Sequence, residues 1–398
     1  MRQPEIYERP KYAKPPRRRP WLIALPLAVV VLIGVCWSAF WFYAASQVGP
    51  AIDGWRAREA KAGRIHTCDS QTIAGYPFRI EVDCKAPGIE FQPASALRLS
   101  DSGRPLVVTA KDIAVVAQVY DPTLLIAEIA SPMTVTEKGQ PPTFSVNWSL
   151  AQVSVRGTPT EPERISIAVD RPEFANFNRG AMELVATASH VELHGRIASG
   201  SVNNNPQIEL VTRLVGAVAP SLHPMMAQPT DSEITATLTG LKNFAPKPWS
   251  ERFREIAAAN GKIEIKQARL SQGDVLAVGA GTLSLNANGK LDGQLTLTVV
   301  GLDKLITRLG ADQAMSQYLA QKGGGMNMDK IGGALDRILP GLGGAVRNNS
   351  GAIAAAGISM LGQPADIEGK KGVSLPLKFT DGAVYLGPIP VGQTPALF

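Results

Sequence analysis

Residues that usually carry enzyme chemistry are scarce in this chain of 398 residues. It has three cysteines and four histidines, and aromatic residues make up only 6% of it. The Gly-x-Ser-x-Gly motif of serine hydrolases is absent, and the glycine run at 323–325 lacks the Lys-Ser/Thr of a phosphate-binding loop. These absences argue against a motif-bearing hydrolase or nucleotide hydrolase. We expect a protein that is not an enzyme and has no metal or cofactor.

Two of the four histidines have a spacing that is found in metal sites on helices. His190 and His194 are four residues apart, which would put two ligands on one face of a helix. Val191 and Leu193 alternate with polar residues, however, and this alternation is typical of a strand. Residues four apart in a strand lie about 13 Å from each other, too far to share one metal ion. We therefore interpret both histidines as solvent-facing strand residues.

Acidic residues are few at the start of the chain, and this imbalance accounts for most of the net charge. The whole chain carries +6, and its first twenty residues hold seven basic and two acidic side chains. The rest of the sequence is therefore almost neutral, without a basic stripe that would predict nucleic-acid binding. The basic segment instead indicates membrane topology and contact with anionic headgroups.

Charge is missing altogether from Trp21 to Tyr43, a run of 23 residues. As a helix it would extend about 34 Å, enough to cross a hydrocarbon core of about 30 Å. Arg17, Arg18 and Arg19 precede the run and predict a cytoplasmic N-terminus, with the chain from about residue 47 exported. A cleaved signal peptide is the alternative interpretation, although Ala44 and Ser46 make a poor cleavage site.

The three cysteines fit an exported chain. Cys36 lies in the apolar run, where we expect a free, packed thiol. Cys68 and Cys84 flank a turn signal centred on Tyr76, so a hairpin closing there would bring the two sulfurs together across it. We predict a disulfide that contributes on the order of 3 kcal/mol, against the alternative of two buried free thiols.

The exported part has the composition of a β protein. Short runs alternate apolar and polar residues between glycines and prolines, so each sheet should have one apolar and one polar face. The clearest hairpin runs from Gly281 to Val299 around Asn288-Gly289, a dipeptide that favours a type I′ turn. Its inward positions are the candidates for contact with lipid: Leu283, Leu285, Leu295 and Leu297.

Helical patterns interrupt the strands in three places. Short helices are predicted at about 50–62 and 248–260, each ending before a glycine, and a helical period replaces the β pattern from about 302 to 362. The latter segment could cap the core, form a lid or touch the membrane. The predicted division is a cytoplasmic tail (1–20), an anchor (21–44), a β-rich half (47–218), a Pro-rich linker (219–230) and a second β-rich half (231–398).

Two motifs carry a resemblance to a known family. The segments Gly75-Tyr76-Pro77-Phe78-Arg79 and 379–390 (Phe-Thr-Asp-Gly-Ala-Val-Tyr-Leu-Gly-Pro-Ile-Pro) resemble the bacterial domain of unknown function 2125 family. The strands of 261–299 are similar to repeats in AsmA-like envelope proteins. That second similarity implies an inner-membrane anchor and sheets whose apolar face is associated with phospholipid movement.

Together these observations predict a mainly β (α+β) protein of the bacterial inner membrane, with an N-terminal transmembrane helix and an elongated or trough-like assembly of antiparallel sheets in the periplasm. The leading hypothesis is binding or transfer of a lipid along an apolar sheet face, with phospholipid as ligand and the bilayer as partner. The alternative is a scaffold with self-packed faces that binds other envelope proteins. A hydrolase has no supporting residues.

Overall fold

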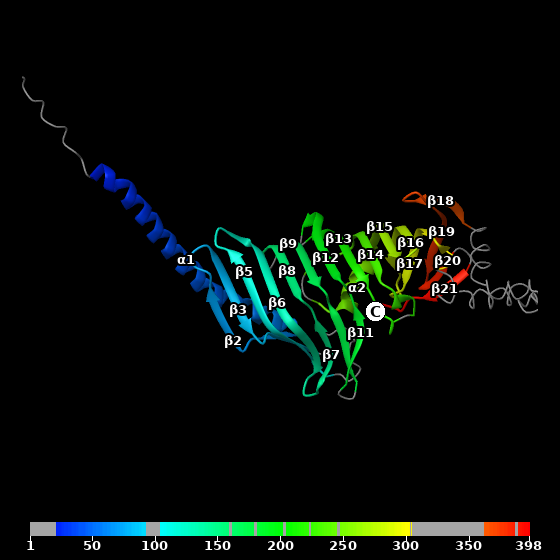
Figure 1. Cartoon of the computed structure of the whole chain (residues 1–398), viewed down its shortest axis with the longest axis horizontal. Helices are drawn as coiled ribbons and strands as arrows, with labels where there is room; N and C mark the ends of the chain where they lie inside the picture. Colours follow the sequence, from blue (N-terminus) through cyan, green and yellow to red (C-terminus); the bar gives the residue numbers. More distant parts are fainter. Residues whose placement is uncertain are drawn as a thin grey trace, which may run out of the picture.

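The computed structural model describes residues 21–92, 104–158, 161–178, 181–201, 204–222, 224–244, 247–302, 304, 362–386 and 389–398. Arg17, Arg18 and Arg19 and nearly all of the predicted helical insert at 302–362 lie outside these ranges. Within them the chain is mainly β, with one long helix at its start, so the predicted fold class is confirmed. Figure 1 shows an elongated molecule, with the helix at one end and the strands side by side along the long axis.

The long helix α1 (Trp21–Lys61) is a single element of 41 residues. Two separate helices were predicted here, divided before Pro50, and that prediction is wrong. A proline inside a helix removes one hydrogen bond and costs about 3 kcal/mol. The contacts that the following turns make with the sheet offset this cost: Trp55 packs on His66 with ring centroids 4.3 Å apart, and Arg56 donates to Gln71 at 2.9 Å.

One side of α1 lies against the sheet. The positions that are at least half-buried include a series spaced three or four residues apart, as expected for one face of a helix. Cys36 is not among them: it is a free thiol and exposed, so the expectation of a packed thiol is wrong. The contacting face consists of Trp37, Trp41, Ala44, Val48, Ile52, Trp55 and Glu59.

The first strands form two long hairpins that follow α1. The outer hairpin has an interruption in each arm, between β1 and β2 and between β3 and β4, and the inner one is nearly continuous. Antiparallel pairing joins β1 to β4, β2 to β3, both β3 and β4 to β5, and β5 to β6. The strands are β1 (Arg64–Thr67), β2 (Ser70–Ala74), β3 (Arg79–Lys85), β4 (Gly88–Phe91), β5 (Leu106–Gln118) and β6 (Asp121–Glu137).

The middle of the sheet continues from β6. In one row, β8 pairs with β6 and is followed by β9, β12 and β13. In a shorter branch, which lies below that row in Figure 1, β7 also pairs with β6 and is followed by β10 and β11. These strands are β7 (Pro142–Asn147), β8 (Leu150–Gly157), β9 (Pro162–Asp170), β10 (Glu173–Asn178), β11 (Ala181–Thr187), β12 (His190–Ser201) and β13 (Asn204–Ala217).

The last part of the sheet is built in the same way. β13 pairs with β14 directly, and the pairing then runs through β15, β16, β17, β19 and β20 to β21, with β18 beside β19. The elements are the 3-10 turn η1 (Pro224–Ala227), β14 (Thr230–Leu238), α2 (Trp249–Ala258), β15 (Lys262–Gln272), β16 (Val275–Leu285), β17 (Leu291–Val300), β18 (Gln363–Ile367), β19 (Lys370–Thr380), β20 (Ala383–Leu386) and β21 (Ile389–Gln393). Strands of both predicted halves therefore share one sheet, and α2 matches the predicted helix at 248–260.

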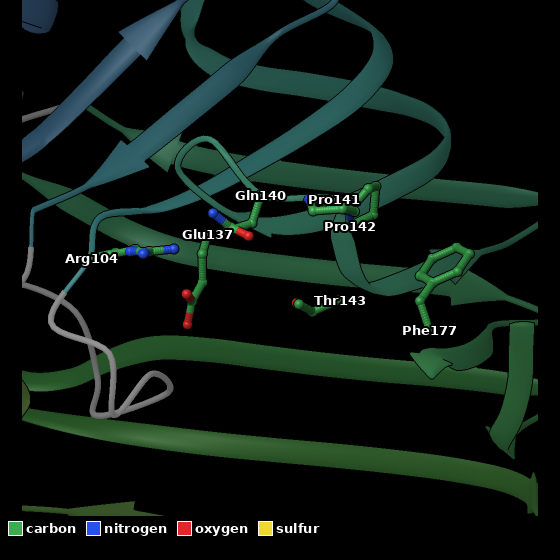
Figure 2. Close-up of a pocket in the computed structure, with 7 residues that line it drawn as sticks. All are labelled: Arg104, Glu137, Gln140, Pro141, Pro142, Thr143 and Phe177. Carbon is green, nitrogen blue, oxygen red and sulfur yellow. The ribbon is translucent and has the colours of Figure 1, made fainter. Parts of the chain in front are cut away.

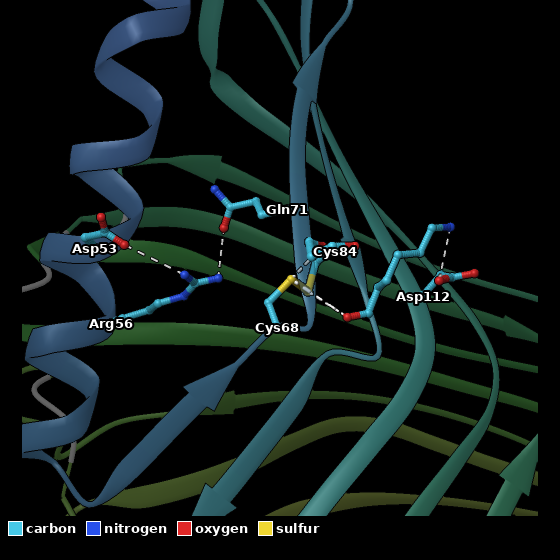
Figure 3. Close-up of a disulfide and its surroundings, with 8 residues drawn as sticks. Asp53, Arg56, Cys68, Gln71, Cys84 and Asp112 are labelled. Atoms are coloured by element: carbon cyan, nitrogen blue, oxygen red, sulfur yellow. Dashed lines mark hydrogen bonds and ion pairs between the residues drawn. A yellow bond between two sulfur atoms is a disulfide. The ribbon is translucent and has the colours of Figure 1, made fainter.

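The disulfide joins Cys68 to Cys84 as predicted, with Cα atoms 5.8 Å apart (Figure 3). Cys68 lies at the interruption between β1 and β2, and Cys84 is a buried residue of β3. The backbone NH of Asp69 donates to the carbonyl oxygen of Lys85 at 3.0 Å beside this bond. The disulfide therefore ties the first hairpin together where its regular pairing is interrupted.

The turn of that hairpin contains the first family motif. Gly75 has a φ of +104°, and a Cβ there would lie 2.7 Å from the carbonyl oxygen of Arg79. Only glycine has free access to this backbone region and leaves room for the close approach. The NH of Arg79 donates back to the carbonyl oxygen of Gly75 at 3.1 Å, which closes the turn.

Candidate functional site: the open apolar face of the sheet

One face of the sheet is apolar across most of its width. Residues directly opposite each other in antiparallel strands share a face, so the register follows this face from strand to strand. The row that starts at Ile80 continues through apolar partners without a charged residue. It reads Ile80, Ala117, Leu125, Val155, Ile165, Gly195 and Leu210.

A second row, two residues further along each strand, has the same character. It begins at Val82 and ends at Ile234, with one threonine among its members. Because residues two apart in a strand point to the same side, the two rows form one apolar face. The second row reads Val82, Val115, Ala127, Val153, Ile167, Leu193, Thr212 and Ile234.

The opposite face of the same strands carries charged residues that are joined by ion pairs. His190 contacts Asp170 at 2.5 Å and Glu192 at 2.9 Å. Further along, Glu209 pairs with Arg196 and, at 3.0 Å, with Lys266. All of these side chains alternate with members of the apolar rows, so the charged residues of these strands lie on one side of the sheet, where they are accompanied by some apolar side chains such as Val116 and Ile126.

The hydrogen bonds of His190 affect its protonation. The bond with Glu192 and the bond with Asp170 favour the imidazolium and raise the pKa of His190 above its ordinary value. Glu192 has a lowered pKa for the same reason. His194 lies on the same face of β12, which is a strand as predicted. No group of three or more metal-ligating side chains occurs in the part of the chain that the structure describes.

Coverage of the apolar face differs strongly along the sheet. Near α1, the helix lies on it: Gln71 and Ile73, opposite Cys84 and Val82, are both partly covered. At the C-terminal end, Val299 and Leu375 are each 1% exposed and form a cluster with Leu302 and Leu386. Both ends of the apolar face are therefore packed by residues of the chain itself.

The middle of the face is packed much less. Ile165 on β9 is 40% exposed and Leu193 on β12 is 39% exposed, although both lie at the centre of the sheet. Two polar neighbours on the other side, Ser166 and Glu192, are less exposed than these apolar residues. We call the following eight residues, none of which is buried, the open apolar stretch: Leu125, Ala127, Val153, Val155, Ile165, Ile167, Leu193 and Leu210.

The four leucines singled out from the sequence lie on the same face but nearer its covered end. Leu283 pairs with Gly293 and Leu285 with Leu291, in register with Leu295 and Leu297. Leu283 is buried, and Leu297 packs on the C-terminal cluster. The open apolar stretch was not identified from the sequence, although the alternation of 165–169 marks the strand that contains Ile165. Whether any of these residues touches lipid stays a prediction.

A pocket of about 580 Å³ shares no lining residue with the open apolar stretch (Figure 2). It is open to solvent, and its lining comes mainly from the turn between β6 and β7, with no serine, cysteine or histidine that could act as nucleophile or base. We assign it no chemistry. Its lining residues are Arg104, Glu137, Gln140, Pro141, Pro142, Thr143 and Phe177.

Comparison with known proteins finds a matching family. A family model described as an uncharacterized protein conserved in bacteria, DUF2125, matches residues 41–395. This match includes both motifs, the disulfide and the whole sheet, and it begins at Trp41 within α1. No curated protein matches the sequence.

Proposed function

The chain belongs to the DUF2125 family, and from its structure we propose an envelope protein, anchored in the bacterial inner membrane by α1, that binds or transfers a lipid along the open apolar stretch. The N-terminus would be cytoplasmic and the sheet periplasmic. The protein would not be an enzyme.

The observation that carries this proposal is the uncovered centre of the apolar face. An apolar sheet face is normally covered by helices or a second sheet. Here α1 covers one end and the C-terminal cluster the other, and the centre between them exposes isoleucine and leucine side chains. Contiguous exposed apolar surface of this kind marks a binding site for a protein, a membrane or a ligand. An acyl chain lying across β6 to β13 would bury it.

The helix supports the membrane part of the proposal. The segment Ala24–Lys61 contains a window that is apolar enough to cross a bilayer, and only 6% of that window is buried in the protein. A helix packed in a soluble core would be mostly buried. Most of the large side chains of 25–35 are exposed, as lipid-facing residues would be.

Photo-crosslinking in cells tests lipid binding. A photoreactive side chain at Ile165 should capture phospholipid, whereas the same side chain at Ser166 should not, because adjacent residues of a strand point to opposite faces. Leu285 with Thr296 gives a second matched pair, nearer the covered end. The absence of lipid at Ile165 and Leu285 in a folded protein would contradict the proposal.

That negative result would favour the second candidate, a scaffold that binds other envelope proteins. The observation behind it is the close packing of Val299 and Leu375, which shows that part of the apolar face is covered by the chain itself. A protein partner would then cover Ile165, and the crosslinked product would be a protein adduct of defined mass. Mass spectrometry of the purified protein would separate the two cases further, since only a lipid binder would carry phospholipid in stoichiometric amount.

A further inference from the structure

The turn of the first hairpin is held by the apolar segment of α1. The indole Nε1 of Trp37 donates to the carbonyl oxygen of Pro77, and that of Trp41 to the carbonyl oxygen of Arg79, both at 2.8 Å. The hydroxyl groups of Ser38 and Tyr76 lie 2.8 Å apart. The turn is thus fixed at one level of the helix by three hydrogen bonds.

That level matches the far boundary of a hydrocarbon core that α1 would enter at Trp21. Trp37 and Trp41 follow Trp21 by about 24 and 30 Å along a continuous helix, and the core of a bilayer is about 30 Å thick. If α1 spans a membrane from Trp21 onward, the turn 75–79 cannot be in bulk water. It must lie where the acyl chains meet the headgroups.

The side chains of the turn suit this position. Tyr76 and Phe78 are each more than half exposed, although both contact indole rings of α1. The ring centroids of Tyr76 and Trp41 are 5.4 Å apart, and those of Phe78 and Trp37 are 6.2 Å apart. Aromatic rings are enriched at membrane interfaces, where one part of the ring is apolar and the other meets water. In a chain with 6% aromatic residues, this is an unusual concentration.

The neighbouring turn between β5 and β6 adds one more ring at the same edge. The NH of Val119 donates to the carbonyl oxygen of Phe78 at 3.1 Å, which places the two turns side by side. Tyr120, the next residue, is 65% exposed. The exposed rings of α1 at this level are Phe40, Phe42 and Tyr43.

We infer that these two turns form a second membrane contact: Tyr76, Phe78 and Tyr120 insert into the far interface of the bilayer that α1 crosses. The inference rests on the proposed anchoring. It has a consequence for lipid binding, because the apolar row of the sheet starts at Ile80, one residue after the Trp41 contact with Arg79. A lipid would pass from the bilayer to the open apolar stretch along Ile80, Ala117 and Leu125 without exposure to water.

Depth-dependent fluorescence quenching tests this contact with the full-length protein in bilayers of phosphatidylethanolamine and phosphatidylglycerol. A fluorescent non-natural side chain is placed singly at Phe78, Tyr120, Val31 or Ser166, and some lipids carry a spin label near the headgroup or deep in the acyl chain. Phe78 and Tyr120 should lose fluorescence most with the shallow label and Val31 with the deep one. Ser166, on the polar face of β9, should lose none.

The outcomes separate the two proposals. Quenching at Val31 without quenching at Phe78 and Tyr120 would overturn the second contact and leave the anchor intact. Absence of quenching at Val31 would overturn the anchor and with it the contact. Quenching of Ser166 to the level of Phe78 would also overturn the inference, since the sheet would then lie flat on the membrane instead of touching it through two turns.

Discussion

The side-chain amide of Asn286 donates to Asp381, 95 residues further along the chain, at 3.0 Å. Its oxygen accepts from the backbone NH groups of Asn288 and Lys290, also at 3.0 Å. One side chain therefore shapes the turn between β16 and β17 and joins it to the turn between β19 and β20. Lys290 strengthens the same junction through an ion pair with Asp381 at 3.0 Å.

Asn286→Ala should destabilise the protein by about 1 to 3 kcal/mol, because two backbone donors lose their acceptor and the contact with Asp381 is lost. Ala287→Ser is the matched control: its side chain is exposed in the same loop, so the effect should stay within about 0.5 kcal/mol. Urea unfolding of both variants measures the difference. Equal effects would show that the junction does not depend on Asn286.

The disulfide gives a prediction about thiol reactivity. Alkylation of the unfolded, unreduced protein should label Cys36 alone, and reduction should expose Cys68 and Cys84. Cys68→Ala and Cys84→Ala should each lower the free energy of unfolding by on the order of 3 kcal/mol, since either change opens the same loop. The double variant should lose no more than this apart from the small packing effect at Cys84. Labelling of all three thiols without reductant would contradict the bond in the cellular protein.

The orientation of the anchor can be read with fusions at Phe398. A reporter enzyme active only outside the cytoplasm should be active there. Neutral replacements of Arg17, Arg18 and Arg19 should weaken or invert this orientation, because basic residues flanking a span stay on the cytoplasmic side. Neutral replacement of Lys370 and Lys371, far from the span, is the control. Activity of a cytoplasm-only reporter at Phe398 would contradict the proposed export.

The raised pKa of His190 predicts a pH dependence. Its imidazolium is stabilised by Glu192 and Asp170 in the folded state, so this contribution to stability is fully present below the ordinary pKa of about 6.5. It is lost as the pH rises through the higher pKa of the folded state. NMR titration of the imidazole should show that value, and Glu192→Gln should lower it. Glu264→Gln, three strands away on the same face, should leave it unchanged; an equal shift would indicate a general charge effect.

The sequence allowed much of the β structure to be predicted because local signals and tertiary pairing agree. Alternation in 281–299 predicted the hairpin of β16 and β17, and α2 ends close to its predicted boundary. The pairing of Cys68 with Cys84 followed from a turn signal midway between them. In each case the residues that determine the structure lie within about twenty positions of one another, so a local sequence pattern can predict it.

The failures involve contacts that no local pattern contains. Pro50 predicted the start of a separate short helix, but packing of Trp55 and Arg56 on the first hairpin keeps α1 continuous. Asn288-Gly289 predicted a two-residue type I′ turn, yet among these two only Gly289 has a positive φ, because the side chain of Asn286 favours a longer loop. The open apolar stretch was missed for a similar reason: alternation shows which face is apolar but not which part of it the rest of the chain covers.

The order in which strands join the sheet has a consequence for how the protein is made. From β13 to β17 each strand pairs with the one that precedes it in the chain. In a sheet of this kind, most contacts join residues that are close in sequence. Because the chain emerges with its N-terminus first, each new strand finds its partner already in place. The sheet can therefore grow while the chain is being exported. Its first edge forms beside α1, and β21 is added last.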